Sequence, residues 1–373
     1  MHAGKIRVLY VVSTLKRSGP TSQLLNLSSG LSRDRFEARV LTLSPESQDS
    51  MWDDFCDRGI KPQSLGLSRV RGLLFGGQAL RGAVRTYAPH IIHTQGIRAD
   101  TYGAYCVRDT PCIATLRTDP DIDYVRRYGT LFGRVMTSIH WRSLARLTVV
   151  VACADEIAAL VTPHNRHVSV IYNGVDTRQY TPAKADAKLE LRRQLGIRPD
   201  DTVFVVVGPM IFGKDPLTVV RAFQRGRNGS SWTLLFVGDG SLRQDCERES
   251  GSGLSIRFCG QVRNVRNYLQ VADCLVSASK AEGLPNAVME GLACGLPVCL
   301  SDISPHRTLL EHTDGAGCLF PVGDVDALAG RMRELTHRDP HRMRECALKR
   351  VRQTFSAERM ANQYQELYES LVG

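Results

Sequence analysis

The chain has 373 residues, of which 43% are hydrophobic and 23% are charged, and its formal net charge is +10 at pH 7. This length allows two domains with separate cores, and the composition is that of an ordinary soluble protein, which excludes disordered and fibrous classes. No apolar run approaches the roughly 18 residues that a membrane-spanning helix needs. The longest candidate, Leu147 to Ala154, ends at Asp155.

The positive charge is concentrated in the amino-terminal half. Residues 1–170 contain 22 Lys+Arg against 14 Asp+Glu, or +8, and the remainder contains 26 against 24, or +2. A basic half suits an anionic surface or an anionic acceptor. Ordinary solvated charge is the alternative interpretation.

Two features predict a cytoplasmic protein. The apolar start at residues 6–13 is short, lacks a cleavage-like tail and continues into Lys16 and Arg17, so it predicts a first buried strand rather than a signal peptide. The 11 cysteines form no Cys-x-x-Cys pair and most lie in apolar patterns. We therefore expect reduced core thiols, neither metal ligands nor disulfides.

Short apolar strands alternate with helical segments along the whole chain, which predicts an α/β fold with parallel sheets. The expected strands are 6–13, 38–43, 91–94, 112–116, 148–152 and 168–172 in the first half, and 203–208, 233–237, 256–259, 274–277, 297–300 and 318–320 in the second. A break is expected near residues 173–189, before a helix at 189–195. Residues 356–371 are expected to form a last helix.

Two segments of the first half carry charges whose role the sequence leaves open. Asp119, Asp121 and Asp123 form two overlapping Asp-x-Asp patterns, which arise often by chance in loops, and we predict no metal site. Residues 124–146 interleave five arginines with aromatic and aliphatic residues. This segment predicts a basic helix that either lies on an anionic membrane surface or packs its apolar face into the core.

Residues 208–214 (GPMIFGK) nearly form a phosphate-binding P-loop. The pattern fails at Asp215, which stands where a magnesium-binding Ser or Thr is required, so a nucleotide hydrolase is not predicted. Gly238-Asp239-Gly240 lacks a third glycine at dinucleotide spacing, so no nicotinamide site is predicted.

Residues 281–290 (AEGLPNAVME) place two carboxylates eight positions apart. The preceding apolar run predicts a buried strand, and Pro285 suits the first turn of a helix. Glu282 then lies in the strand-to-helix loop and Glu290 between one and two turns into the helix. Backbone N–H groups of residues 283–287 would provide a seat for phosphate. The segment thus offers a carboxylate for sugar hydroxyls, an anion site and a second carboxylate for a ribose.

This segment resembles the Glu-x7-Glu signature of retaining glycosyltransferases, especially glycosyltransferase family 4. Further resemblances follow the family's order along nearly the whole chain: Asn173-Gly174-Val175-Asp176, Gly208 to Lys214, Gly238-Asp239-Gly240, Phe258-Cys259-Gly260, Gly317 to Phe320, and Gly323-Asp324. The resemblance implies the GT-B architecture, two Rossmann-like doubly wound parallel-sheet domains facing across a cleft. We expect an acceptor-binding domain at 1–173, a nucleotide-sugar-binding domain at 174–355, and a final helix at 356–373 that crosses back to the first domain.

The resemblance also implies roles for individual residues. Lys214 would contact the donor diphosphate, Glu282 the donor sugar and Glu290 the donor ribose. The remaining implied donor-site residues are Gly208, Gly283, Leu284, Pro285, Asn286, Val262, Arg263 and Gly19.

Three positions depart from the family pattern. Pro209 stands where the family carries a phosphate-binding Arg, and proline supplies neither charge nor N–H. Arg263 is a candidate replacement. Arg117 stands where the family often has a His, and it would hold an anionic acceptor or the leaving phosphate, or else pair with Asp119 or Asp121. In residues 18–22 (SGPTS), Gly19 keeps the permissive position of the family's Gly-Gly loop, and Ser18 or Thr21 would bind phosphate or acceptor.

The implied activity is a retaining, metal-independent hexosyl transfer from a UDP- or GDP-linked sugar, with no cofactor. The implied acceptor is a lipid-linked or growing polysaccharide in cell-surface glycan synthesis. We expect a cytoplasmic protein, free or peripheral at the inner face of the membrane, with no nucleic-acid partner. Two alternatives remain open: a catalytically silent homologue that binds a sugar nucleotide or a partner transferase, and a sugar-nucleotide epimerase.

Overall fold

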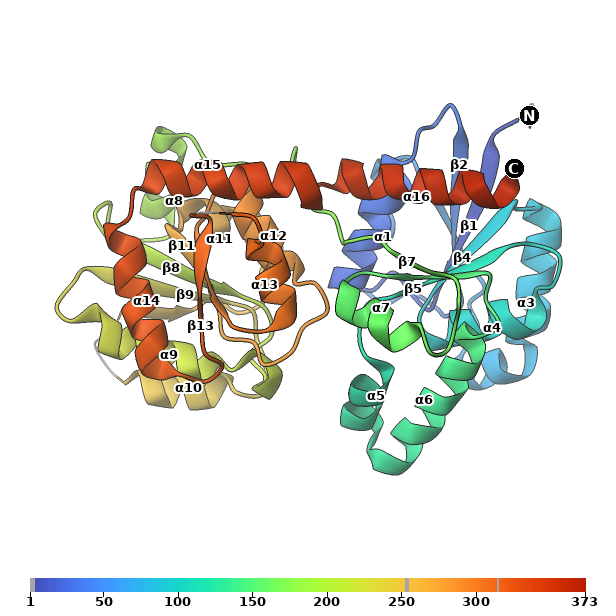
Figure 1. The fold of residues 1–373 in the computed structure, drawn as a ribbon, viewed down its shortest axis with the longest axis horizontal. Coiled ribbons are helices and arrows are strands. Elements are labelled where there is room, and N and C mark those ends of the chain that lie inside the picture. The colour runs from blue at the N-terminus through green and yellow to red at the C-terminus, as the bar shows by residue number, and fades with distance from the viewer. Residues whose placement is uncertain (1–3, 252–254, 314) are drawn as a thin grey trace. The chain divides into compact units, whose positions relative to one another are not determined.

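A computed structural model describes residues 4–251, 255–313 and 315–373. Its contacts divide the chain into two compact units (Figure 1): unit 1 is Met1–Gly174 with Ala357–Gly373, and unit 2 is Val175–Ser356. The boundaries expected from the sequence, 173/174 and 355/356, each lie one residue away from these divisions.

Unit 1 contains a parallel sheet of strands whose apolar side chains are buried on both faces. The strands are β1 Ile6–Val12, β2 Phe36–Thr42, β3 Lys61–Ser64, β4 Ile91–Gln95, β5 Cys112–Leu116, β6 Val149–Ala152 and β7 Val168–Val170. Their order is β3-β2-β1-β4-β5-β6-β7. The order reverses beside β1, so the unit is a doubly wound sheet, and the crevice beside this switch point is where such folds bind ligands.

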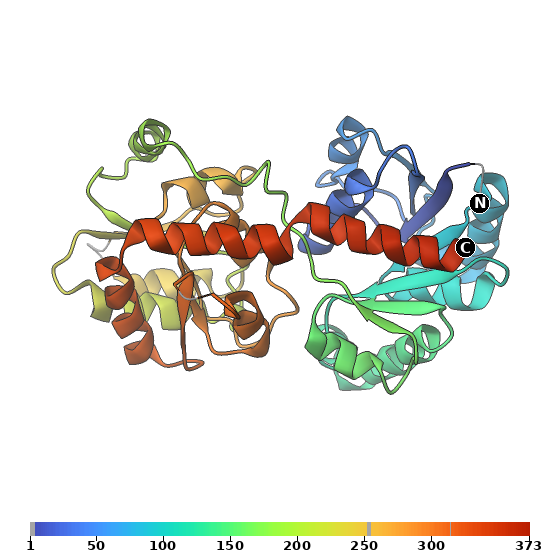
Figure 2. The same cartoon turned by 45° about the horizontal axis from the view of Figure 1, so that its top comes forward.

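The helices of unit 1 cover both faces of this sheet. They are α1 Gly19–Gly30, α2 Trp52–Asp57, α3 Arg69–Tyr87, α4 Ile97–Cys106, α5 Pro120–Tyr128, α6 Thr130–Leu144, α7 Asp155–Val161 and α16 Ala357–Val372. Helix α1 packs against α16, and α4 packs against α3 and α6. Figure 2 shows α16 beside the first strands.

Helix α16 is the last element of the chain, yet its side chains belong to the core of unit 1. Tyr364 and Tyr368 are buried, and their hydroxyls join a polar network with His93 and Thr115. The Tyr368 hydroxyl lies 2.6 Å from His93 Nδ1, and Thr115 Oγ1 lies 2.7 Å from both His93 Nε2 and the Tyr364 hydroxyl. Burial lowers the pKa of His93 to about 3, so the ring is neutral and the network carries no buried charge.

Unit 2 contains a second parallel sheet. Its strands are β8 Thr202–Val207, β9 Trp232–Val237, β10 Ile256–Phe258, β11 Cys274–Ser277, β12 Val298–Ser301 and β13 Gly317–Phe320, in the order β10-β9-β8-β11-β12-β13. The order reverses between β8 and β11, which places a second switch point at the carboxyl ends of these two strands.

Helices also cover both faces of the second sheet, as Figure 1 shows. They are α8 Ala185–Gln194, α9 Pro216–Arg227, α10 Arg243–Ser250, α11 Val265–Val271, α12 Asn286–Ala293, α13 Ser304–Leu310, α14 Val325–His337 and α15 Pro340–Arg350. Helix α9 packs against α10 and α14, whereas α12 packs against α11 and α15.

The structure confirms the predicted α/β class and each predicted strand, but corrects two details. Strand β3 was not predicted from the sequence, and the helix expected over 124–146 is two helices. Gly129 ends α5 and precedes α6 with φ 79°, a backbone conformation that breaks a continuous helix. Within the described ranges no helix is long and apolar enough to cross a membrane.

Candidate active site

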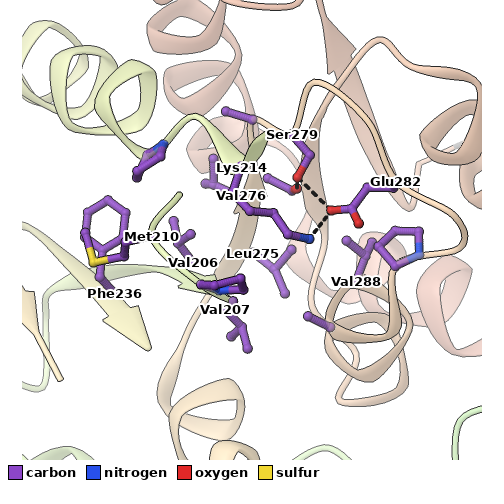
Figure 3. Close-up of a pocket in the computed structure, with 17 residues that line it drawn as sticks. Val206, Val207, Met210, Lys214, Phe236, Leu275, Val276, Ser279, Glu282 and Val288 are labelled. Atoms are coloured by element: carbon purple, nitrogen blue, oxygen red, sulfur yellow. Dashed lines mark hydrogen bonds and ion pairs between the residues drawn. The ribbon is translucent and has the colours of Figure 1, made fainter. Parts of the chain in front are cut away.

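A pocket lies in unit 2 at the carboxyl ends of β8 and β11, beside the switch point, and we call it the carboxyl-edge pocket (Figure 3). It is lined by the end of β8 and its following loop, the loop after β11, and the start of α12. The lining includes Gly208, Pro209, Met210, Lys214, Ser277, Ser279, Glu282, Pro285, Ala287 and Val288.

Close backbone approach fixes the loop that carries Gly208 and Pro209. Gly208 N donates to Val237 O at 2.9 Å, and Met210 N donates to Asp239 O at 3.0 Å. A side chain at Gly238 would place its Cβ 2.0 Å from Gly208 O, and φ at Gly238 is 142°. Only glycine fits there, so the Gly-Asp-Gly pattern serves to pack two loops together.

Lys214 and Glu282 meet at the base of this pocket. Lys214 ends a short 3₁₀ turn, and its ammonium forms an ion pair with Glu282 Oε1. Ser279 Oγ donates to the same carboxylate oxygen at 2.7 Å, and Ser301 Oγ donates to Ser279 O at 2.6 Å. Figure 3 shows Lys214 and Ser279 converging on Glu282. About 20 Å³ remains beside these groups, room for little more than one water. The pair therefore takes up much of the pocket, and an anion that binds Lys214 would compete with Glu282 for the ammonium.

A second lysine, which was not predicted as a site residue, lies on the same loop as Glu282. Lys280 N donates to Gly213 O at 2.9 Å, and its ammonium lies 3.9 Å from the centre of the Phe212 ring. The same ammonium lies 3.4 Å from Asp215 Oδ2. Asp215, the residue that broke the P-loop pattern, thus holds a cation next to the pocket.

His306 of α13, also missed from the sequence, is fully buried beside these charges. Its Nδ1 lies 2.8 Å from Ser301 O, and within the described residues Nε2 has no hydrogen-bond partner. Burial lowers the pKa of His306 to about 4, against an opposing effect of Glu282. The ring is therefore neutral at pH 7 and Nδ1 donates to the carbonyl.

Glu290 lies in the second turn of α12, as predicted, but it has a protein partner. Its carboxyl is hydrogen-bonded to the Tyr180 side chain, and burial raises its pKa to about 7. Burial also raises the pKa of Tyr180, with Glu290 adding to the effect. Pro285 is the cap residue of α12, which begins at Asn286, so the predicted helix start is one residue early.

Two sequence families together span most of the chain. Residues 17–179 match the model of the family described as Glycosyltransferase Family 4, and residues 201–338 match that described as Glycosyl transferases group 1. The chain belongs to the family 4 glycosyltransferases.

An N-acetyl-alpha-D-glucosaminyl L-malate synthase of Bacillus anthracis is 26% identical over 69% of this chain and 65% of its own length. A UDP-Gal:alpha-D-GlcNAc-diphosphoundecaprenol alpha-1,3-galactosyltransferase of Escherichia coli is 28% identical over 45% of each chain. The chain thus spans between about half and two thirds of these relatives.

Solved structures establish the GT-B architecture of this glycosyltransferase. Sucrose-phosphate synthase from Thermosynechococcus elongatus has a TM-score of 0.80 at 19% identity, covering 98% of this chain and 99% of its own. Anabaena HepE in complex with UDP and glucose has a TM-score of 0.79 at 19% identity, covering 98% of this chain and 100% of its own. The predicted fold class is confirmed.

The structure places the predicted residues of the family 4 glycosyltransferase in three groups. Gly208, Lys214, Glu282 and Pro285 line one pocket, and Gly283, Leu284 and Asn286 lie in the same loop and helix start. Val262 and Arg263 lie in the loop after β10 and do not line the pocket, and Arg263 is exposed. Gly19 and Arg117 lie in unit 1.

Arg117 follows β5 in unit 1 and holds a guanidinium group that is only partly used. Its Nη1 donates to Asn173 Oδ1. Its Nε and Nη2 are buried, and they have no hydrogen-bond partner in the part of the chain that the structure describes. The predicted alternative, a salt bridge to Asp119 or Asp121, does not form. Because buried donors without partners are costly, this side chain is suited to receive an anion or a hydroxyl oxygen.

The hydroxyls near Gly19 are engaged locally. Ser18 caps α1 by accepting from Thr21 N at 3.4 Å, and Thr21 Oγ1 donates to Lys16 O at 2.7 Å. Gly19 is the first residue of α1 and does not have a positive φ, so its permissive backbone is not used. What this loop offers a ligand is therefore the amino end of α1.

The acidic cluster at 119–123 serves the fold. Asp119 accepts from Asp121 N at 2.8 Å and caps α5, and Asp121 Oδ2 accepts from Trp141 Nε1 at 3.0 Å. In the described ranges no group of three or more His, Cys, Asp or Glu residues could hold a metal ion.

The raised pKa of Glu290 predicts a pH-dependent stability difference. The folded state retains the proton up to about pH 7, whereas the ordinary value is 4.5. Stability from this group is therefore full below about pH 4.5 and is lost as pH rises through 7. Glutamine does not titrate, so Glu290→Gln should not lose this stability as pH rises. The free energy of unfolding of the variant minus that of the parent should therefore increase by about 3 kcal/mol between pH 4.5 and 8. Urea unfolding at both pH values measures this difference, with exposed Glu311→Gln as the control. An unchanged difference would refute the raised pKa.

Proposed function

We propose that this glycosyltransferase moves a sugar from a nucleotide-diphosphate sugar to a lipid-linked or polysaccharide acceptor in cell-surface glycan synthesis, with retention of anomeric configuration. The observation that carries the proposal is the Lys214–Glu282 pair in the loops that precede α9 and α12. It puts a cation and a carboxylate at the switch point, where doubly wound sheets bind ligands. The relatives support the acceptor class, since one acts on a diphosphoundecaprenol-linked sugar and another is an O-antigen chain mannosyltransferase.

In this proposal the donor diphosphate binds at the carboxyl-edge pocket, with the rest of the donor lying outside it. The diphosphate binds the Lys214 ammonium and the amino end of α12, where backbone N–H groups and the helix dipole favour negative charge. Glu282 is released from Lys214 and accepts hydrogen bonds from the hydroxyls of the donor sugar. Glu290, which Tyr180 already holds by a hydrogen bond, binds the ribose.

The acceptor hydroxyl then attacks the anomeric carbon on the face from which the diphosphate departs. A carbon–oxygen bond forms to the acceptor, the bond from the anomeric carbon to the phosphate oxygen breaks, and the acceptor proton passes to that phosphate oxygen. Lys214 stabilises the charge that develops on the leaving group. Arg117 of unit 1, whose Nε and Nη2 have no partner in the described residues, is proposed to bind an anionic group of the acceptor.

Thermal unfolding with UDP, GDP, ADP and their sugar conjugates, first in EDTA and then with Mg²⁺, tests the donor class and the metal-independent reaction. We expect one nucleotide series to raise the Tm in EDTA by several degrees, because a ligand at about 100 times its Kd adds about 2.7 kcal/mol of stability. Stabilisation only with Mg²⁺ would overturn the metal-independent mechanism.

Pro209 supports one alternative, a catalytically silent homologue that binds a sugar nucleotide or a partner transferase. This residue lines the pocket where the family pattern has an arginine, so one expected phosphate contact is missing. Nucleotide binding without transfer to any acceptor would favour this alternative over the epimerase, which would convert the sugar nucleotide without an acceptor.

We also propose that the α5–α6 surface of unit 1 docks on an anionic membrane. Ile122, Leu131 and Phe132 are 59%, 76% and 72% exposed. Arg126 and Arg127 of α5 have side chains that are 62% exposed. Apolar side chains next to arginines are the pattern of an interfacial helix.

Vesicle co-sedimentation tests this surface. Binding to vesicles with about 30% phosphatidylglycerol should exceed binding to neutral vesicles by about tenfold, since each basic residue near an anionic surface adds about 1 kcal/mol. The Leu131→Ser/Phe132→Ser double variant should lose this binding. Leu189→Ser, which alters a leucine of unit 2 that is 49% exposed, should keep it. Equal binding by both variants would refute the surface.

A further inference from the structure

Unit 2 has a second pocket at the opposite edge of its sheet, which we call the amino-edge pocket. It lies at the amino ends of β8 and β11, is open to solvent, and has a volume of about 530 Å³, within the range of small-molecule sites. Helix α8, the loop after α12, and the segment that joins α14 to α15 supply its walls. None of the residues that line the carboxyl-edge pocket lines this one.

The lining combines apolar side chains with cations. The apolar part includes Phe204, Leu296, Leu335 and Met343. The charged part consists of Lys188, Arg338, Arg344 and one acid, Asp273, with His341 beside them. Arg338 pairs with Glu334 outside the lining, so Lys188 and Arg344 face the one carboxylate and leave the pocket positive.

The single acid is already neutralised from within the protein. Asp273 Oδ1 accepts from Lys188 Nζ at 2.7 Å, and Oδ2 accepts from Arg192 Nη2 at 2.7 Å and from Val203 N at 2.8 Å. Burial lowers the pKa of Lys188, and Arg192 and Arg344 lower it further against the opposing effect of Asp273. The negative charge of Asp273 thus balances only part of the positive charge of Lys188, Arg192 and Arg344.

Arg344 is the cation of the lining whose charge is not balanced by an acidic partner. Within the described residues its guanidinium has neither an ion-pair nor a hydrogen-bond partner, whereas Arg338 pairs with Glu334. Its stem lies against Gly295, where an added Cβ would be 2.9 Å from Arg344 Cγ and where φ is 78°. The stem of the exposed Arg344 side chain therefore lies beside Gly295 at the pocket wall.

We propose that the amino-edge pocket binds a small anionic ligand with an apolar body, its negative group on Arg344 and Lys188 and its apolar part against Leu296, Leu335 and Met343. Charge complementarity argues for the anion, and the apolar walls argue against a bare inorganic ion. Helix α12 runs between the two pockets. Ala287 and Val288 near its amino end line the carboxyl-edge pocket, and Cys294 and Gly295 just beyond its carboxyl end line this one. The proposal is independent of the one for the carboxyl-edge pocket.

Fluorescence titration of the full chain with 8-anilinonaphthalene-1-sulfonate tests the site, with the neutral probe N-phenyl-1-naphthylamine in parallel. Arg344→Ala should weaken sulfonate binding by about tenfold and neutral binding by less than about twofold, because only the sulfonate loses a charge-assisted contact. Ala185→Trp, which fills the pocket from the α8 wall, should weaken both probes. Arg342→Ala on the same helix, outside the lining, is the matched control.

Equal sulfonate affinity for Arg344→Ala and Arg342→Ala would overturn the proposal. So would unchanged binding of both probes to Ala185→Trp when its thermal unfolding matches the parent. If Ala185→Trp does not fold, the ratio of sulfonate to neutral binding in Arg344→Ala still decides, since a loss of packing alone would lower both probes together.

Discussion

Replacing Glu282 by Gln is expected to lower the rate of sugar transfer by about 10²- to 10³-fold, the loss typical when one group that stabilises the transition state is removed. Glutamine keeps the size of the side chain and can still accept from Ser279 Oγ, but it loses the charge that holds Lys214. Nucleoside diphosphate binding should therefore stay equal or become tighter, because the ligand no longer competes with Glu282 for the ammonium. Initial transfer rates and calorimetric titration with the nucleotide measure the two effects separately.

Measuring nucleotide binding and transfer rate separately distinguishes a catalytic role of Glu282 from a purely structural one. A structural loss would weaken nucleotide binding and transfer together, whereas the proposed role keeps the first and loses the second. Glu311→Gln, at an exposed carboxylate in unit 2, should leave both unchanged. Full transfer activity in Glu282→Gln would remove Glu282 from the mechanism.

The fold was largely predictable because most strands are apolar runs bounded by turn residues. β3 was not, because Lys61-Pro62-Gln63-Ser64 contains no apolar run and only Pro62 is buried. It pairs at the edge of the sheet with β2, so backbone hydrogen bonding rather than side-chain pattern makes it a strand. The break at Gly129 was missed for the opposite reason, since the surrounding sequence has good helical composition and a single positive φ interrupts it.

The candidate site was predictable only where residues adjacent in sequence form it. Glu282 and Pro285 were predicted together because they lie in one loop. Lys214 was predicted to join them because residues 208–214 match the family pattern. The partners that modify these groups come from elsewhere in the chain: Tyr180 for Glu290, and Ser301 with His306 beneath the loop. Ser279 had no local signal, because Ser-x-x-Glu marks a helix start only where the Ser caps the helix, and α12 begins at Asn286. Lys280 had none, since its contact with Phe212 depends on the path of two loops.

Lys214→Ala should weaken nucleoside diphosphate binding in EDTA by about 10- to 100-fold, the loss expected for one charge-assisted contact to phosphate. Pro209 makes the expected loss larger, because the pocket lacks the arginine that would share the diphosphate charge. Calorimetric titration of the variant in EDTA provides the measurement. Lys61→Ala, at an exposed lysine of unit 1, is the control.

Lys280→Ala decides whether a second cation compensates for Pro209. The Lys280 ammonium is held by the Phe212 ring and by Asp215, so reaching the diphosphate requires it to leave both. If it does so, Lys280→Ala should weaken binding by a similar factor and Lys214→Ala should retain measurable affinity. If it does not, Lys280→Ala should bind like the parent and Lys214 alone carries the diphosphate. Parent-like binding by Lys214→Ala would contradict the proposed donor site, because no other cation lines the carboxyl-edge pocket among the residues that the structure describes.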